Sequence, residues 1–311
     1  MSAVKVSIII TIYNQIKYLK DSIESALAQT LDDKEIIIID DCSNDGSFSE
    51  ILNITASQKI CPIKIIRNDK NKGVIYSRNK GINLATGEYI LPLDGDDIIL
   101  PKYTQIASNY LDNHEDCGIV YCQVEQFGER SGLFCPPEFD PSKIWILNQI
   151  ISCALFRKTD WIKVNGYDPL FTNGHEDWDL WISILSLGRK AHKIDKVLFK
   201  YRILKTSRTT RAILFLKEAK LDILRKHINW ILSMPQAAEY LLQQANSNLE
   251  LERITNENTY IKNKLDELNR NLSYLNNEIG VYKRKYRKYR LGFIILLSLL
   301  SYSALYNAYF L

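Results

Sequence analysis

The sequence of 311 residues lacks the glycine-rich motifs with which many proteins bind phosphate groups. No G-x-G-x-x-G follows the first β-branched run, and no G-x-x-x-x-G-K-S/T occurs anywhere in the chain. A phosphate cradle built from backbone amides is therefore excluded. If the protein binds a nucleotide, a metal ion or basic side chains have to hold its phosphate groups.

The sequence also lacks the cysteine pattern of a zinc site and the leader of a secreted protein. Its six cysteines contain no C-x-x-C pair, and matching histidine spacing is missing. The apolar run Val4–Ile10 is too short for the core of a signal peptide and is typical of a strand. Reduced thiols in a cytosolic compartment are therefore expected.

An excess of positive charge is missing from most of the chain. The formal net charge is +4, but six Lys and Arg residues fall within residues 283–290 alone. The rest of the chain is close to neutral, whereas proteins that bind nucleic acids present a basic face. No nucleic acid partner is expected.

Runs of strand length alternate with helical patterns in about the first 95 residues. The expected strands are 4–10, 35–39, 63–66 and 89–93, and the clearest helix between them is 74–84. This alternation predicts an α/β fold, with a mostly parallel sheet and helices on both faces.

Polar residues gather where these apolar runs end. The carboxyl ends of parallel strands meet at one edge of a sheet, and ligands of α/β proteins bind at that edge. The sequence places the following residues along it: Thr11, Tyr13, Asp41, Arg78 and the group Asp94–Asp97.

The stretch Gly87–Asp97 ends an expected buried strand on three carboxylates within four positions. These carboxylates repel one another, and a divalent cation would compensate their charge. Mg²⁺ and Mn²⁺ prefer oxygen ligands and are commonly shared between one or two carboxylates and substrate phosphates. The alternative is a solvated Asp-Gly turn without a ligand.

The second half of the chain carries a second acidic pair. Its expected elements are a helix 102–111, strands 118–124, 150–156 and 191–202, a loop 128–141 and a helix that opens with Glu176 and Asp177. Acidic residues in the first turn of a helix are stabilised by its dipole, by about 0.3–1 kcal/mol. This stabilisation accounts for the pair without any further role. A helix that starts at the sheet edge would also point Asp177 at the acidic group Asp94–Asp97.

The segments T-I-Y-N, I-I-D-D-C-S-N-D-G-S, S-R-N-K-G-I-N-L-A-T-G-E-Y-I and L-D-G-D-D resemble the inverting family 2 glycosyltransferases. The resemblance runs from about Val4 to about Ser207. It implies a GT-A type, Rossmann-like sheet. Residues 1–100 would form the nucleotide-sugar-binding half, and residues 101–210 the half that binds the acceptor and carries the catalytic base.

The resemblance also implies roles for single residues. It makes Asp177 the catalytic base, and Asp96, together with Asp94, the ligand of Mn²⁺ or Mg²⁺. The residues implied to contact the nucleotide-sugar are Thr11, Tyr13, Asp41, Arg78, Asp94, Arg202 and Ser207. Each of four residues also has an alternative role. Thr11 and Tyr13 could simply pack at a strand end, Asp41 could cap a turn, and Arg78 could pair with a loop carboxylate.

The C-terminal third predicts a long helical extension. Within the helical region 211–290, apolar residues at spacings of three and four predict a coiled coil over about 251–282, and hence a homo-oligomer. The basic cluster 283–290 precedes 291–311, which carries no charge and is about as long as a bilayer core is thick. This arrangement predicts a C-terminal anchor that leaves the protein on the cytoplasmic side of the membrane. The alternatives are a helix lying on the catalytic body and a buried oligomerisation helix.

These features together predict a metal-dependent inverting glycosyltransferase. It would move a hexose or N-acetylhexosamine from a nucleoside-diphosphate sugar, expected to be a UDP-sugar, to a hydroxyl of a glycan or lipid-linked glycan in membrane-associated surface polysaccharide assembly. The alternatives are a catalytically vestigial, membrane-anchored coiled-coil scaffold and a nucleotidyltransferase on a similar sheet.

Overall fold

The computed structural model describes residues 3–172, 174–205, 215–234 and 239. Its contacts divide the chain into two compact units, Met1–Ala219 and Lys220–Leu311. Ser207, the coiled coil 251–282, the basic cluster 283–290 and the anchor 291–311 lie outside the described residues. Every other residue of the predicted site lies in the first unit.

Among the residues that the structure describes, no helix combines the length and the apolar character needed to cross a bilayer.

The first unit begins with strictly alternating strands and helices, as expected. They are β1 (Val6–Ile12), α1 (Leu19–Leu27), β2 (Lys34–Asp40), α2 (Ser47–Thr55), β3 (Ile63–Arg67), α3 (Val74–Leu84) and β4 (Tyr89–Asp94). The strands lie in the order β3-β2-β1-β4, and every neighbouring pair is parallel. Their carboxyl ends therefore meet at one edge of the sheet.

Helices cover both faces of this sheet, which explains why its strands are apolar without alternation. Every other side chain of β1, from Val6 to Ile12, faces a core to which α1, α2 and α4 contribute. On the opposite face α3 lies very close to the sheet, because a Cβ added at Gly81 would come within 2.6 Å of Ile9 Cγ2. β1 is therefore buried along its whole length.

The rest of the first unit extends the same sheet. The elements are β5 (Ile98–Ile99), α4 (Tyr103–Asn113), β6 (Cys117–Gly128), β7 (Gly132–Phe134), β8 (Leu155–Arg157), α5 (Lys158–Lys163), α6 (Glu176–Ser186) and β9 (Lys190–Ile203). The helix α8 (Leu216–Ile231) spans the boundary between the two units and is the described part of the predicted helical region.

Two predictions about this region are wrong. The strand expected over 150–156 is confined to Leu155–Arg157, because residues 150–154 are apolar but not laddered, and the Cys153 carbonyl accepts a hydrogen bond from Tyr103 Oη at 2.6 Å. The loop expected over 128–141 contains β7, which pairs antiparallel with β6. β7 is short and its three residues are exposed, so the sequence contains no buried apolar run from which this strand could be predicted.

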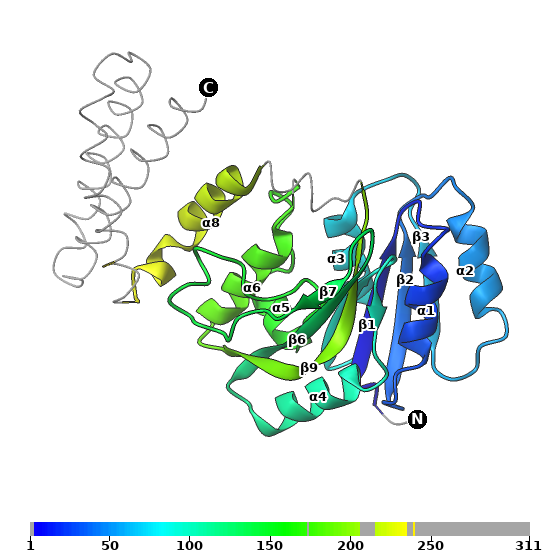
Figure 1. The fold of residues 1–311 in the computed structure, drawn as a ribbon, viewed down its shortest axis with the longest axis horizontal. Coiled ribbons are helices and arrows are strands. Elements are labelled where there is room, and N and C mark those ends of the chain that lie inside the picture. The colour runs from blue at the N-terminus through cyan, green and yellow to red at the C-terminus, as the bar shows by residue number, and fades with distance from the viewer. Residues whose placement is uncertain (1–2, 173, 206–214, 235–238, 240–311) are drawn as a thin grey trace, which may run out of the picture. The chain divides into compact units, whose positions relative to one another are not determined.

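The sheet is mixed and curls back on itself. Its order is β3-β2-β1-β4-β8-β6-β9-β5, with β7 beside β6. Most paired residues lie in parallel ladders, including the long β6–β9 pair, but β8 runs antiparallel to both of its neighbours. Only residues 95–97 separate β4 from β5, although β5 stands at the far end of the strand order and pairs with β9. The curl therefore brings β9 back to the acidic end of β4 (Figure 1).

Candidate active site

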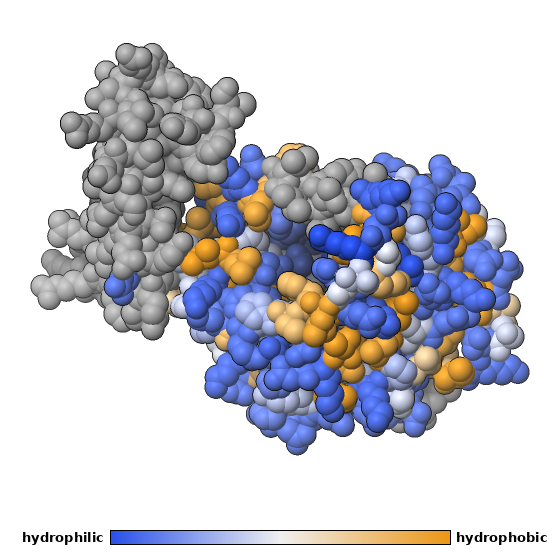
Figure 2. Space-filling view, in the orientation of Figure 1, coloured by the Kyte–Doolittle hydropathy of each residue, from blue (hydrophilic) through white to orange (hydrophobic). Residues whose placement is uncertain are grey.

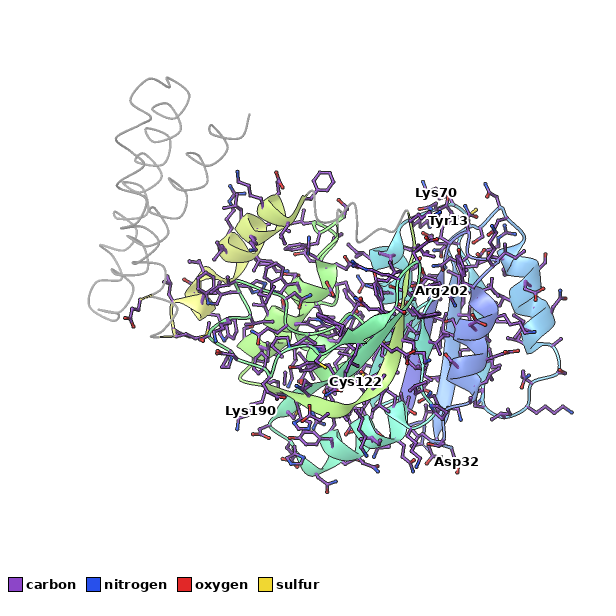
Figure 3. The ribbon with its side chains drawn as sticks, viewed as in Figure 1. Tyr13, Asp32, Lys70, Cys122, Lys190 and Arg202 are labelled. Carbon is purple, nitrogen blue, oxygen red and sulfur yellow. The ribbon has the colours of Figure 1, made fainter. Side chains whose placement is uncertain are left out.

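The ends of β1 and β4 meet at the predicted edge. Thr11 and Asp94 are register partners, and Thr11 Oγ1 donates a hydrogen bond to Asp94 Oδ1 at 3.3 Å. Tyr13 follows β1 and is 47% exposed. Figure 3 places Tyr13 at one end of the sheet and Asp32, which precedes β2, at the other. The exposed Tyr13 ring is therefore available to a ligand at the carboxyl edge.

Asp41, at the end of β2, organises the loop between β3 and α3. Its carboxylate is buried and accepts hydrogen bonds from Asn68 Nδ2 at 2.8 Å and from the backbone N–H groups of Lys72 at 2.9 Å and Gly73 at 2.8 Å. An ionised carboxylate offers about four lone-pair positions. These three donors hold Asp41 in place and leave capacity for a ligand N–H group.

Residues Asp94–Asp97, at the end of β4 and just after it, form an acidic loop that concentrates negative charge in a partly buried position. Burial, followed by the charge of Asp94, raises the pKa of Asp96 to about 6. Burial, followed by the charges of Asp96 and Asp94, raises the pKa of Asp97 well above its usual range. Burial and neighbouring carboxylates therefore disfavour the ionised forms of Asp96 and Asp97, whereas Asp94 is paired with the Arg78 guanidinium.

A divalent cation fits this loop chemically. In the part of the chain that the structure describes, no three His, Cys, Asp or Glu residues cluster in a way that could hold a metal ion by themselves. Mg²⁺ and Mn²⁺ sites commonly take only one or two carboxylates and complete their shell with water and substrate phosphates. Asp96 and Asp94 could supply those carboxylates, and a cation there would favour the ionised form of Asp96, whose pKa is raised by burial and then by the charge of Asp94.

Arg78 links the two acidic motifs. Its guanidinium is buried in α3, with Nη2 at 2.7 Å from Asp94 Oδ1 and Nη1 at 2.8 Å from Glu176 Oε1. The Tyr167 ring lies 5.5 Å from its Cζ atom. Arg78 therefore brings the end of β4 and the start of α6 together, although Glu176 lies 98 residues further along the chain. The alternative role of Arg78, pairing with a loop carboxylate, also agrees with its contact to Asp94.

Asp177 occupies the first turn of α6, next to this bridge. Its Oδ1 accepts the backbone N–H of Trp178 at 2.8 Å, and its Oδ2 accepts Asn148 Nδ2 at 3.3 Å. Burial and then the charge of Glu176 raise the pKa of Asp177, while Arg78 acts in the opposite direction. A carboxylate with a raised pKa next to a charged cluster is well suited to accept a proton.

Arg202 belongs to β9 and contacts the acidic loop directly. Its backbone N–H donates to Asp97 Oδ1 and its Nε to the Asp96 carbonyl, both at 2.8 Å, while Nη2 lies 2.7 Å from Asp21 Oδ2. The rings of Tyr18 and Phe127 lie 4.8 Å and 4.3 Å from its Cζ atom. In the structure Arg202 thus fastens β9 to the loop after β4, and its expected contact with a diphosphate stays a prediction.

Backbone strain marks three of the predicted motifs. Asn14, Cys42 and His175 have φ values of 53°, 63° and 66°. Asn14 and Cys42 directly follow the predicted site residues Tyr13 and Asp41, and His175 lies two residues before Asp177. Non-glycine residues in this region of φ are uncommon. Such strain persists where the surrounding structure over-determines the backbone, often at functional sites. The strain supports the positions of the motifs.

Sequence reasoning missed two residues of this site. Asn148 lies in the segment between β7 and β8, in a stretch without any recognisable motif, and nothing in the sequence could have identified it. Glu176 was recognised as an acidic residue of the first helical turn and as the partner of Asp177 in the Glu-Asp pair that the family resemblance implies, but no role was assigned to it. Its position beside Asp177 was a signal, but its ion pair with Arg78 depends on the three-dimensional fold.

Comparison with known proteins identifies the family. Residues 7–160 match the model of glycosyl transferase family 2. An uncharacterized glycosyltransferase of Methanocaldococcus jannaschii is 33% identical over 208 residues, which cover 64% of this chain and 70% of the relative. The UDP-Glc:alpha-D-GlcNAc-diphosphoundecaprenol beta-1,3-glucosyltransferase WfaP of Escherichia coli is 32% identical over 203 residues, which cover 64% of this chain and 77% of WfaP.

A solved structure supports the fold. The crystal structure of S. aureus TarS 1-349 in complex with UDP-GlcNAc aligns with a TM-score of 0.64 at 18% identity, over 85% of this chain and 80% of that chain. At this identity the likeness concerns the fold alone. The acidic loop after β4 lies inside the residues matched by the family model, and Asp177 and Arg202 follow it. This chain belongs to glycosyl transferase family 2 and is a glycosyltransferase with the GT-A fold.

Proposed function

We propose that this enzyme transfers a hexose or an N-acetylhexosamine from a UDP-sugar to a hydroxyl group of a lipid-linked glycan, with inversion at the anomeric carbon. The observation that supports the proposal is the Arg78 bridge, which joins Asp94, at the start of the acidic loop, to Glu176, the neighbour of Asp177. The names of two relatives support the choice of substrates. WfaP is described as acting on UDP-Glc and a diphosphoundecaprenol-linked GlcNAc, and TarS was crystallised with UDP-GlcNAc.

The chemical step needs a base and a stabilised leaving group. Asp177 removes the proton of the acceptor hydroxyl while the hydroxyl oxygen attacks the anomeric carbon. The bond from that carbon to the diphosphate breaks in the same step. The proton ends on Asp177 and the bonding electrons leave with the UDP. A single displacement of this kind inverts the anomeric configuration, so no covalent enzyme intermediate is needed.

The donor side of the site binds and orients the nucleotide. Asp41 and Tyr13 stand at the strand ends where the nucleoside is expected, and Asp94 is held by Thr11 and Arg78. Asp96, with Asp94, would hold Mn²⁺ or Mg²⁺. When bound, this ion neutralises the negative charge that develops on the departing diphosphate.

An apolar surface supports a lipid-linked acceptor. Leu133 and Phe134 of β7 are 63% and 47% exposed. Figure 2 has apolar surface near the middle of the drawn face, in the area where Figure 1 draws β6 and β7. β6 lies between β7 and β9 and pairs with the part of β9 that carries Arg202, so one strand separates the exposed side chains of β7 from the strand that reaches the acidic loop.

The test is transfer by the full chain with UDP-glucose or UDP-N-acetylglucosamine, a GlcNAc-diphosphate-lipid acceptor and Mn²⁺. We expect a β-linked product from the α-linked donor, read by NMR of the purified product. Activity is expected to disappear on addition of EDTA and to return with Mn²⁺. An α-linked product would contradict inversion, and full activity in EDTA would contradict the metal. The vestigial scaffold predicts neither UDP binding nor transfer.

We further propose that the protein works as an oligomer at the cytoplasmic side of the membrane, joined through residues 251–282 and anchored through 291–311. The uncharged stretch and the preceding basic cluster of the sequence support this proposal. A full-length protein that is recovered without detergent as a soluble monomer would contradict both parts.

A further inference from the structure

The segment 140–150, between β7 and β8, is anchored firmly beside α6. Gln149 bonds the backbone of Asp140 twice, since its Oε1 accepts the Asp140 N–H at 2.9 Å and its Nε2 donates to the Asp140 carbonyl at 2.8 Å. Ile144 and Trp145 are buried, and Trp178 of α6 donates its indole N–H to the Ile144 carbonyl. The two ends of the segment are therefore bonded to each other, and its middle is bonded to α6.

Asn148 is the residue of this segment that reaches the reaction centre. Its Nδ2 donates to Asp177 Oδ2, and its own Oδ1 accepts the backbone N–H of Ile150, both at 3.3 Å. The second bond fixes which way the amide points, because an N–H group can be met only by the amide oxygen. The amide N–H is thus directed at the carboxylate of Asp177.

Resting on the function proposed above, we propose that Asn148 is a positioning residue for the catalytic base, and that segment 140–150 exists in part to present it. Each oxygen of Asp177 then receives one donor, Oδ1 from the Trp178 N–H at the start of α6 and Oδ2 from Asn148. Two donors from different parts of the chain fix the rotation of the carboxylate about its χ angles. The remaining lone pairs stay directed at the acceptor hydroxyl.

The same hydrogen bond controls when Asp177 is ionised. The groups that act on it electrostatically are Glu176, Arg78, His175 and Tyr167. Burial and Glu176 disfavour the carboxylate form, whereas a hydrogen-bond donor favours it. Asn148 is uncharged, so it can support the ionised base without forming an ion pair that would lower its basicity further.

The test measures the ionisation of Asp177 directly, without relying on turnover. The full chain is labelled with ¹³C at the aspartate carboxyl carbons, and the Asp177 signal is assigned from its loss in Asp177→Asn. The chemical shift is then followed against pH in the wild type, Asn148→Ala and Asn148→Asp. We expect the Asp177 midpoint to rise by about half to one pH unit in Asn148→Ala. In Asn148→Asp we expect a larger rise, because a second carboxylate then faces the base.

Two further variants serve as controls. Leu147→Ala alters an exposed side chain of the same segment that does not touch Asp177, and it is expected to leave the midpoint unchanged. Asn148→Ser keeps a hydrogen-bond donor on a shorter side chain, and its midpoint is expected to fall between those of the wild type and Asn148→Ala. If Asn148→Ala does not fold, the Asp and Ser variants still bracket the effect.

Activity data separate this inference from the proposed function. The acid limb of the turnover number at saturating UDP-sugar is expected to move with the NMR midpoint, while the Kd for UDP stays the same. An unchanged midpoint in both Asn148→Ala and Asn148→Asp would overturn the role of Asn148, even if Asp177 is the base. Shifted midpoints with full activity in Asp177→Asn would instead overturn the base and leave the hydrogen bond standing.

Discussion

Replacing Asp177 by asparagine is expected to lower the turnover number by about 10²–10⁴-fold, the usual contribution of a general base. The amide keeps the size of the carboxylate, but its single oxygen can accept only one of the two donors that face Asp177, and it cannot accept the proton of the acceptor hydroxyl. The affinity for UDP, measured by isothermal titration calorimetry, is expected to stay close to that of the wild type, because the donor residues lie at the strand ends and on the acidic loop.

The pH profile gives this prediction a sign. Burial, followed by the charge of Glu176, raises the pKa of Asp177, and the base works only when it is ionised. The wild-type turnover number should therefore fall, as the pH decreases, closer to neutrality than for an ordinary aspartate. Asp116→Asn, a control at an exposed carboxylate paired with Lys190, should leave both turnover and profile unchanged. Substantial turnover in Asp177→Asn would remove Asp177 from the mechanism.

Replacing Arg78 by methionine is expected to destabilise the protein by roughly 3–5 kcal/mol, the cost of breaking a buried ion pair from one side. The guanidinium side chain is 3% exposed, and the paired side chains of Glu176 and Asp94 are 5% and 32% exposed. Without Arg78, both carboxylates keep their charge but lose their cation. Urea unfolding of the full chain, followed by tryptophan fluorescence, measures the loss.

A double-mutant cycle tests the cause. Glu176→Gln in the Arg78→Met background removes one of the two stranded charges, so part of the lost stability should return. Arg78→Lys keeps the positive charge, but its ammonium group cannot bond both carboxylates as the planar guanidinium does. Its stability should therefore lie between that of the wild type and that of Arg78→Met. Lys190→Met, at an exposed ion pair, should leave the unfolding midpoint where it is. Stability equal to that of the wild type in Arg78→Met would mean that the bridge does not hold the site together.

The strands β1, β2 and β4 were predictable because they are buried on both faces, whereas β3 is only half-buried and was recognised from its short apolar run. A strand such as β1 then reads as an unbroken β-branched run, and the bounds of α3 follow from its helical spacing. The same reasoning fails for segment 150–154, where a strand was expected. This segment is apolar and largely buried, but it does not pair with another strand. β7 is exposed along its whole length, so no apolar pattern could reveal it.

The candidate site was predictable to the same extent. Strand topology alone puts Thr11, Asp41 and Asp94 at one edge, since parallel strands end together. The Arg78–Glu176 pair and the contact of Asn148 with Asp177 depend on which distant segments pack together, and local spacing carries no trace of that. Arg202 was expected at the diphosphate, and the curl of the sheet that places it on the acidic loop arises from the pairing of β5 with β9.

The ion pair between Arg78 and Glu176 also limits how this chain can exchange parts with a relative. Recombination near residue 100 would join the residues before that point from one parent to the residues after it from the other. Arg78 would then come from one parent and the residue at position 176 from the other, inside a buried site that tolerates no unmatched charge. A hybrid enzyme with a new pairing of donor and acceptor is therefore viable only when these two positions are inherited as a compatible set.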